Sequence, residues 1–205
     1  MNCIEVPGLS CIDIEIKVEN FIKKYFIENY ESPQEVDLIT TFESGYLEKI
    51  TNFSEDIQDL PNSIEALIDF NNKQIVLSDS THENLINNIP RAKFTLAHEI
   101  GHSILHNNYM NGIIEDGGTI KYLNRGNIPS YKDSEWQANY FAGAFLMPYI
   151  HMERLIIGNK SLKEISNIFG TSSQATKIRY DNVLKIINSG KLLTPGVNIN
   201  PQNRR

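Results

Sequence analysis

Residues 91–106 read RAKFTLAHEIGHSILH and contain the pattern H-E-x-x-H, from His98 to His102. Residues four apart in a helix differ by little more than one turn, so His98 and His102 would project from one face. Each imidazole can give one nitrogen to a zinc ion. Glu99 follows the first histidine, and its carboxylate can take a proton from water that zinc has made more acidic. The pattern therefore predicts a metal site with hydrolytic chemistry.

The surrounding residues predict that this pattern lies on a buried helix. Pro90 suits a first helical turn, and the next proline is Pro129. Apolar residues recur at helical spacing, at Phe94, Leu96, Ala97, Ile100, Ile104 and Leu105. Gly101 lowers helix stability by about 1 kcal/mol relative to alanine. We therefore expect another backbone to approach closely at Gly101.

A catalytic zinc site needs a third protein ligand. In the arrangement H-E-x-x-H-x-x-G-x-x-H that ligand would be residue 108, but Asn108 stands there and Leu105 replaces the glycine. Residues 134–148, SEWQANYFAGAFLMP, predict a second helix that is buried on most sides and carries Glu135. A charged Glu135 there needs a partner such as zinc, and Asn139 could hydrogen-bond a zinc-binding histidine. The alternative is a solvated glutamate that the helix dipole favours.

These two segments together resemble the ImmA/IrrE family of bacterial metallo-endopeptidases. The resemblance rests on residues 94–102, Leu105, His106 and 135–148, and it extends more loosely into the C-terminal third. It implies a gluzincin-like fold and a protein substrate, typically a helix-turn-helix repressor of phage, mobile-element or stress genes. It also implies one Zn²⁺ per chain, with these residue roles: His98, His102 and Glu135 as ligands, Glu99 as catalytic base, and Asn139 at a matching motif position.

The whole chain has the composition of an ordinary globular protein, with 205 residues, 40% hydrophobic and 21% charged. Its two cysteines, Cys3 and Cys11, cannot form a disulfide framework and suit reduced thiols. No apolar run approaches the length needed to cross a bilayer, and the first residues do not resemble a signal peptide. We therefore expect a cytoplasmic bacterial protein with no membrane partner.

Charge is distributed unevenly along the chain. Residues 151–205 contain nine basic and three acidic residues, whereas residues 1–150 carry a net charge of −12. An acidic body disfavours general nucleic-acid binding, although the basic C-terminal part could attract phosphate.

The pattern predicts further elements in the first half of the chain. We expect a helix over residues 14–25 and a second that starts at the capping box Ser32–Glu35 and ends at Gly45. Residues 46–53 weakly indicate a strand. Residues 66–70 and 73–77 predict a hairpin around an Asn-Asn turn. We expect the 73–77 strand to form the sheet edge, where a peptide substrate could pair.

Residues 108–133 are rich in glycine and asparagine and predict a long loop, a candidate lid or substrate-contact segment. Tyr109, Tyr122 and Tyr131 lie in or beside it and could stabilise an oxyanion, although plain surface packing is favoured for each. His106 could approach the metal or the substrate, but a buried or supporting role is favoured because the helix rises about 6 Å over four residues.

Two other histidines have simpler interpretations. His151 could lie near the cleft, but we favour a role in capping the C-terminus of a helix. His82 lies in a polar stretch that predicts an exposed loop.

The C-terminal part predicts a helix-turn-helix-like segment. Residues 161–170 begin with the capping box Ser161–Glu164 and end at Gly170, and a second helix follows from residue 171. This pair could bind DNA, but we favour a role in supporting the zinc domain. The fold class is therefore α+β: a helix-rich zincin-like domain with a small antiparallel sheet, then this helical segment. We divide the chain into residues 1–60 (N-terminal helices), 61–150 (metallopeptidase core), 151–190 (helical segment) and 191–205 (disordered tail).

Two classes of function compete. The first is a zinc-dependent endopeptidase, in which Glu99 acts as the base. The second is a regulatory binding protein with a structural or idle metal site, which binds a repressor or DNA or acts as a toxin–antitoxin partner. An intact Glu99 favours the endopeptidase, because a structural site has no need of a base.

Overall fold

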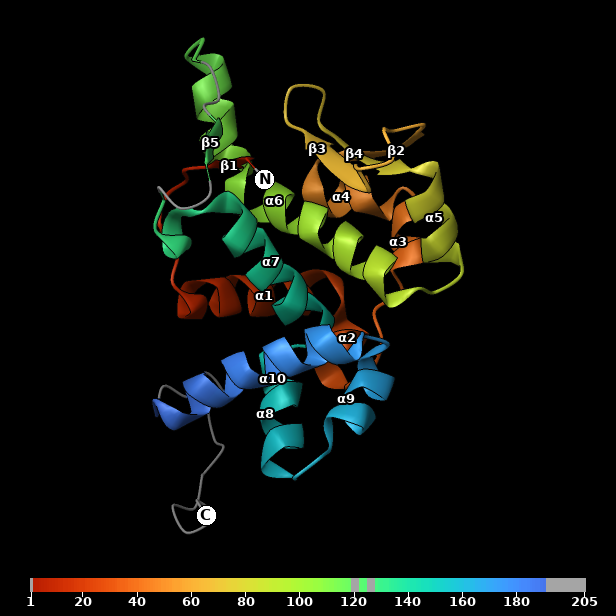
Figure 1. Ribbon diagram of the computed structural model, residues 1–205, viewed down its shortest axis with the longest axis vertical. Helices are drawn as coiled ribbons and strands as arrows, with labels where there is room; N and C mark the ends of the chain where they lie inside the picture. Colours follow the sequence, from red (N-terminus) through yellow and green to blue (C-terminus); the bar gives the residue numbers. More distant parts are fainter. Residues whose placement is uncertain (1, 119–121, 125–127, 191–205) are drawn as a thin grey trace.

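The computed structural model of the chain describes residues 2–118, 122–124 and 128–190, with the backbone alone at residues 2–3 and 122–124. The chain is α+β and mostly helical, as predicted. The long helix α6 (Pro90–Glu115) crosses the upper body, and helix α7 (Ser134–Leu146) packs against it (Figure 1). The sheet and the last three helices lie on opposite sides of this pair (Figure 1). Among the described residues, every helix is too short or too polar to span a bilayer.

Helix α1 (Cys11–Tyr25) confirms the predicted first helix. Ser10 and Asp13 form a capping box at its start, which satisfies two backbone N–H groups. Its apolar face buries Ile14, Val18 and Ile22, and the helix packs against α7.

The prediction that a helix starts at Ser32–Glu35 is wrong. The short helix α2 (Ile27–Glu31) ends there with Ser32 as its C-cap, and α3 (Leu38–Glu43) begins after Asp37, whose side chain accepts from the Thr40 N–H. Glu35 lies 2.5 Å from the Lys93 ammonium, in a largely buried ion pair. A tertiary contact therefore takes the carboxylate that a capping box would need.

The strand predicted over residues 46–53 is also wrong, because α4 (Tyr46–Thr51) occupies most of it. Gly45 before this helix and Asn52 after it both adopt left-handed backbone conformations, with φ of 72° and 61°. Leu47 and Ile50 are buried three residues apart, which suits a helix packed on one face. The strand β2 (Ser54–Gln58) starts only beyond Asn52.

The sheet has the order β2-β4-β3. Strands β3 (Ala66–Asp69) and β4 (Gln74–Ser78) form the predicted hairpin, although its turn covers four residues instead of two. Strand β2 runs parallel to β4, so the sheet is mixed and not purely antiparallel. The 73–77 strand is central, which corrects the prediction that it forms the edge; β3 is an edge strand instead.

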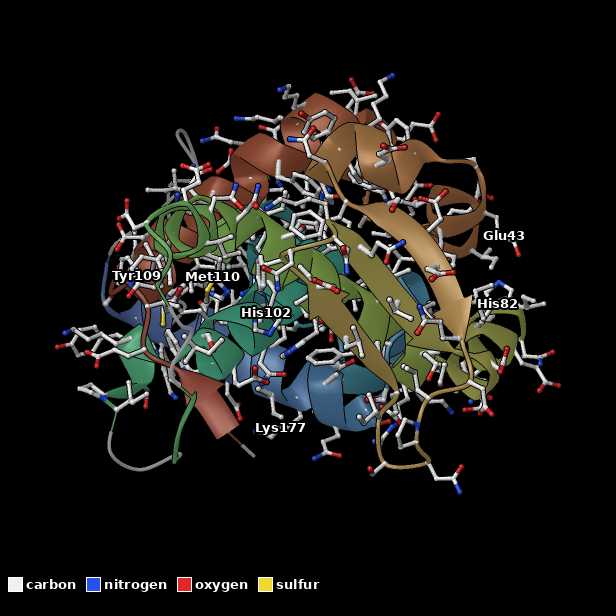
Figure 2. The ribbon with its side chains drawn as sticks, turned by 90° about the horizontal axis from the view of Figure 1, so that it is seen from above. Glu43, His82, His102, Tyr109, Met110 and Lys177 are labelled. Atoms are coloured by element: carbon white, nitrogen blue, oxygen red, sulfur yellow. The ribbon has the colours of Figure 1, made fainter. Side chains whose placement is uncertain are left out.

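Helix α5 (Asp79–Ile86) follows β4 directly and includes His82, which was predicted to lie in an exposed loop. The ring of His82 is half-buried, with Nε2 3.2 Å from the Glu43 carboxylate (Figure 2). Helix α6 then continues to Glu115, so the first eight residues of the predicted 108–133 loop are helical.

The segment between α6 and α7 contains β5 (Tyr122–Asn124) and a short 3-10 helix, η1 (Ser130–Lys132). Strand β5 pairs with β1 (Asn2–Ile4), which brings the start of the chain beside this segment (Figure 1). The backbone N–H groups of Val6 and Leu9 also donate to the carbonyls of Lys132 and Tyr131.

The C-terminal helices are α8 (Tyr149–Ile157), α9 (Leu162–Phe169) and α10 (Ser173–Asn188). Both the Ser161–Glu164 capping box and the left-handed Gly170 that ends α9 are confirmed. The three helices enclose a second hydrophobic cluster that includes Met152, Ile165, Phe169 and Val183. Residues 191–205, predicted to form a disordered tail, lie outside the described residues.

Candidate metal centre

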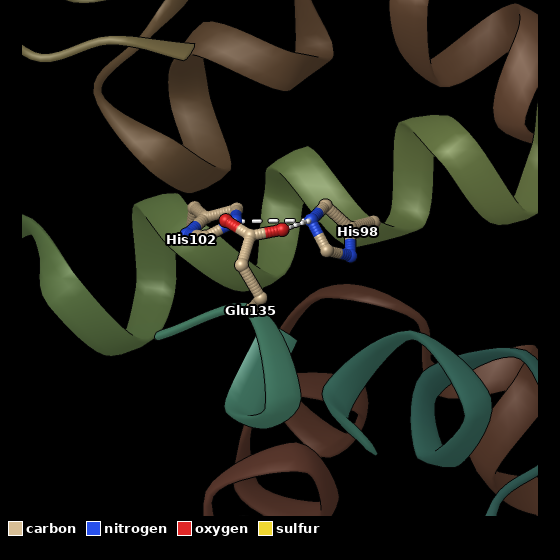
Figure 3. A group of neighbouring side chains, drawn as sticks. All are labelled: His98, His102 and Glu135. Carbon is tan, nitrogen blue, oxygen red and sulfur yellow. Dashed lines mark hydrogen bonds and ion pairs between the residues drawn. The ribbon is translucent and has the colours of Figure 1, made fainter. Parts of the chain in front are cut away.

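The helical periodicity of α6 places His98 and His102 on one face. Leu96, Ala97 and Ile100 are fully buried and fix the helix against the core, so this face is held in one orientation. The ring centroids of the two histidines lie 4.7 Å apart. Their Nε2 atoms are 3.0 Å apart and point toward α7 (Figure 3).

Helix α7 brings Glu135 to the same point. Asp133 caps this helix by accepting from the N–H groups of Glu135 and Trp136, which sets Glu135 in the first turn. The two helices approach closely at Gly101, as predicted. A Cβ atom there would lie 3.2 Å from the Ala138 carbonyl oxygen and 3.1 Å from the Phe141 ring.

Potential ligand atoms of three side chains converge across the two helices. The Glu135 carboxylate places Oε2 3.4 Å from His98 Nε2 and Oε1 3.4 Å from His102 Nε2 (Figure 3). Two ligands bound to one zinc at about 2.0–2.1 Å in tetrahedral geometry lie about 3.3–3.4 Å apart. The two histidine–carboxylate distances involve different oxygens of Glu135, so the cluster fits a zinc ion that lies between the two imidazoles and the Glu135 carboxylate.

The other ring nitrogens of the two histidines also have partners. His98 Nδ1 lies 3.2 Å from Asn139 Oδ1, and His102 Nδ1 lies 3.0 Å from His106 Nδ1. Because an amide oxygen only accepts, Asn139 requires the proton of His98 on Nδ1 and leaves a lone pair on Nε2. This contact would leave His98 Nε2 free to bind a metal.

The electrostatics of the cluster favour a cation. Burial would raise the pKa of Glu135, but hydrogen bonds and charge from His102 and His98 outweigh it and hold this pKa below its usual range. Burial would lower the pKa of His98, yet Glu135 and Glu99 raise it above its ordinary value. Positive charge is thus stabilised between the two imidazoles and the carboxylate.

Glu99 lies beside this cluster and is 8% exposed. Burial raises the pKa of Glu99, and the nearby His102 and His98 offset part of that effect. A general base must lie close to the reacting water and accept its proton. The position of Glu99 beside the cluster makes it the candidate for that role.

His106 lies behind the metal ligands and does not face solvent. It is 1% exposed, and its Nε2 lies 3.1 Å from the Gln137 side-chain oxygen. Burial lowers the pKa of His106 to about 3, so the ring is neutral. Gln137 is fully buried and was not among the predicted site residues. Its position among apolar residues of α7 is the feature of the sequence that could have indicated a buried polar role.

The remaining residues considered from sequence fall elsewhere. Tyr131 is 51% exposed, and its ring lies against Gly8. Tyr109 is exposed on the C-terminal half of α6. The side chain of Tyr122 lies outside the described residues. His151 is buried in the first turn of α8, and its Nε2 lies 2.9 Å from the Asn29 carbonyl oxygen in the last turn of α2, so it contacts the C-terminus of that helix.

The helix-rich α+β architecture and the His-His-Glu cluster define a zinc metallopeptidase-like fold. The chain belongs to the family described as the IrrE N-terminal-like domain (Peptidase_M78), whose model matches residues 47–181. This match confirms the resemblance to ImmA/IrrE metallopeptidases.

One solved structure with a similar fold carries the description "Mycobacterium tuberculosis transcriptional regulator". The two chains share a TM-score of 0.54 and 15% identity, over 80% of this chain and 45% of that chain. This chain thus spans less than half the length of that protein, and the likeness concerns the fold alone. None of the curated proteins compared with the chain matches it.

Proposed function

We propose that the chain is a cytoplasmic zinc endopeptidase that cuts a peptide bond in a protein substrate. The observation that carries this proposal is the convergence of His98 Nε2, His102 Nε2 and the Glu135 carboxylate within 3.0–3.4 Å, beside a buried Glu99. These three residues would hold the zinc. A structural zinc site has four protein ligands, whereas three leave one position for chemistry.

When bound, zinc acts as a Lewis acid on the scissile carbonyl and lowers the pKa of water to about 7. Glu99 accepts the proton of the attacking water and passes it to the leaving amine. Its burial supports this role, because burial raises the pKa of the Glu99 carboxyl group and so favours its uptake of a proton. Asn139 keeps His98 in the tautomer that binds metal.

Among the described residues, no strand pairs with the outer edge of β3, which supports a mode of substrate binding. The Glu65 carbonyl accepts from the Ser78 N–H at 2.9 Å, and bonded pairs alternate along an antiparallel ladder. The main-chain groups of Ala66 and Ile68 therefore point away from β4, toward the open edge. An extended peptide can pair with such an edge as an added strand.

The position of β3 places this edge near the site. The Glu65 carboxylate, just before β3, accepts from Arg91 Nε at 2.6 Å and from the Thr95 hydroxyl at 3.2 Å. Thr95 lies three residues before His98 on α6, so it shares the face that carries the metal ligands. A peptide paired with β3 would accordingly run past the metal centre.

The substrate that we propose is a helix-turn-helix transcriptional repressor of a phage, a mobile element or a stress response. Membership of the IrrE N-terminal-like family supports this class. The description of the structural neighbour as a transcriptional regulator agrees with a role in gene regulation.

The alternative is a regulatory protein that binds DNA or a repressor through α9 and α10. The charges on these helices weigh against DNA binding. Arg179 on α10 is buried in an ion pair with Glu15, and Lys177 on α10 contacts Asp181. Lys160, just before α9, contacts Glu164. The other cations of the two helices are Lys163 and Lys185, which offer little charge for phosphates, on which DNA affinity depends.

The test is to compare new protein N-termini in bacterial cells that express the wild-type chain or Glu99→Gln. Glu99→Gln keeps the side-chain size and the metal ligands but removes the base. We expect new N-termini in a repressor with the wild type alone, and equal zinc content in both purified proteins. If cells with Glu99→Gln show the same change in gene expression as cells with the wild type, but no new N-termini, the regulatory binding protein is the correct interpretation.

A further inference from the structure

A chain of hydrogen bonds leads from two backbone carbonyls to the metal ligand His102. The side-chain nitrogen of Gln137 lies 3.0 Å from the Pro7 carbonyl oxygen and 2.8 Å from that of Tyr131. Gln137 Oε1 lies 3.1 Å from His106 Nε2, and His106 Nδ1 lies 3.0 Å from His102 Nδ1. All three side chains of this relay, Gln137, His106 and His102, are buried.

The two carbonyls fix the orientation of the Gln137 amide. A carbonyl oxygen can only accept, so the nitrogen end of Gln137 must face Pro7 and Tyr131 and donate both of its protons. The oxygen end then faces His106. If the Gln137 amide were flipped, its oxygen would face the carbonyl oxygens of Pro7 and Tyr131. Its nitrogen, a donor, would then face His106.

The Gln137 oxygen in turn fixes the tautomer of His106. His106 Nε2 must carry the proton that is donated to Gln137 Oε1. The ring is 1% exposed and lies beside a second imidazole, so it is neutral and has no proton on Nδ1. His106 Nδ1 is therefore an acceptor, and His102 Nδ1 must be the donor.

The relay of hydrogen bonds ends at the metal ligand His102. With its Nδ1 proton donated to His106, the His102 ring can offer a metal the lone pair of Nε2, the atom that faces His98 and Glu135. We propose that His106 and Gln137 are positioning residues that lock His102 in its metal-binding tautomer. The backbone carbonyls of Pro7 and Tyr131 fix the orientation of the Gln137 amide, and they lie outside the two helices that carry the ligands. This proposal rests on the proposed function only in that the site binds a metal.

The two histidine ligands are thus held in different ways. Asn139, which orients His98, is exposed and accepts directly. The group behind His102 is a buried relay that reaches the segments 7–9 and 130–132, where Gly8 lies beneath the Tyr131 ring. Substrate or solvent can therefore reach Asn139 but not the partner of His102.

The tautomers can be read directly by long-range ¹H–¹⁵N NMR on the full chain, with and without zinc. We expect His106 to carry its proton on Nε2 alone, and His102 to carry a proton on Nδ1 in both states. A His106 ring protonated on Nδ1, or on both nitrogens, would overturn the proposal. The metal-free spectrum decides this point even if the chain binds no zinc, which would instead contradict the proposed function.

Zinc affinity tests whether the relay matters for metal binding. We expect His106→Leu to weaken zinc binding by about 10–100-fold, the range typical for loss of a partner behind a ligand. His106→Gln can still accept from His102 and donate to Gln137, so its zinc affinity should stay within a few-fold of the wild type. Gln137→Leu should weaken binding in the same direction, whereas the exposed Gln174→Leu on α10 should not.

A purely structural role would change only the thermal stability of the metal-free protein. Wild-type zinc affinity in both His106→Leu and Gln137→Leu, with folded proteins, would therefore refute the positioning role. Equal weakening by His106→Leu and His106→Gln would also refute it, because the second variant keeps the direction of the hydrogen bonds.

Discussion

Arg179, in the last helix, forms a buried ion pair with Glu15, which lies 164 residues earlier in the first helix. The two side chains are 2% and 1% exposed. The Tyr140 hydroxyl also donates to Glu15, and Arg179 Nε donates to the Met147 carbonyl. These contacts join α1, α7 and α10 at one point, so the C-terminal helices pack as part of the body that holds Glu135.

Arg179→Met should destabilise the protein strongly, because it leaves the Glu15 carboxylate buried without its cation. We expect a loss of about 3–5 kcal/mol in the free energy of unfolding, measured in urea. The double variant Glu15→Leu/Arg179→Met should recover most of that loss, since apolar replacement of a buried pair is often neutral. Lys177→Met breaks the exposed pair with Asp181 and should change stability by less than about 1 kcal/mol. Equal losses in Arg179→Met and Lys177→Met would contradict this account.

Glu135→Ala should abolish stoichiometric zinc binding, because two imidazoles alone leave a zinc site incomplete. Wild-type protein should contain about one zinc per chain, measured by elemental analysis after dialysis. Glu164→Ala is a matched control, since Glu164 also lies in the first turn of a helix, α9, but is exposed. Zinc retained in Glu135→Ala at the wild-type level would exclude Glu135 as a ligand.

Gly101→Ala and Gly112→Ala should have opposite effects although both lie in α6. A Cβ at Gly101 meets the Ala138 carbonyl and the buried Phe141 ring, so we expect a loss of about 1–3 kcal/mol. A Cβ at Gly112 meets nothing within 4 Å, so alanine there should stabilise the helix by about 0.5–1 kcal/mol. Thermal unfolding of the metal-free proteins measures both. A stabilising Gly101→Ala would show that α6 and α7 do not approach as described.

His151 makes stability depend on pH in a predictable direction. Burial lowers its pKa in the folded protein, whereas the unfolded chain has a pKa of about 6.5. Below that pH the unfolded state takes up a proton that the folded state resists, so the free energy of unfolding falls as the pH falls. His151→Gln keeps a donor for the Asn29 carbonyl but does not titrate.

The comparison of unfolding curves at pH 7 and pH 5, with a chelator present, isolates this effect. We expect the wild type to lose more stability than His151→Gln over that interval, by up to about 1.4 kcal/mol per pH unit below the unfolded pKa. Parallel pH dependence of the two proteins would show that His151 takes up its proton equally in both states.

Several features of the fold follow from local spacing. The start of α6 at Pro90, the shared face of His98 and His102, the β3–β4 hairpin and the Ser161–Glu164 capping box all depend on residues a few positions apart. At that range, helix and hairpin geometry largely determine which groups meet.

Two of the wrong predictions concern places where a distant contact overrides a local signal. Glu35 pairs with Lys93 instead of completing a capping box with Ser32, and β4 lies at the sheet centre because β2 pairs with it in parallel across 20 residues. A parallel pairing leaves no turn signal in the sequence.

Local spacing alone predicts the candidate ligands: two imidazoles on one helical face, a carboxylate beside them, and a second helix with one glutamate among apolar residues. How these groups are held depends on contacts between distant parts of the chain. The close contact of Gly101 with Ala138, the ion pair of Glu15 with Arg179, and the hydrogen bond of Gln137 with Pro7 join residues 37, 164 and 130 positions apart. Such pairings depend on how the helices pack in space, and no local periodicity encodes them.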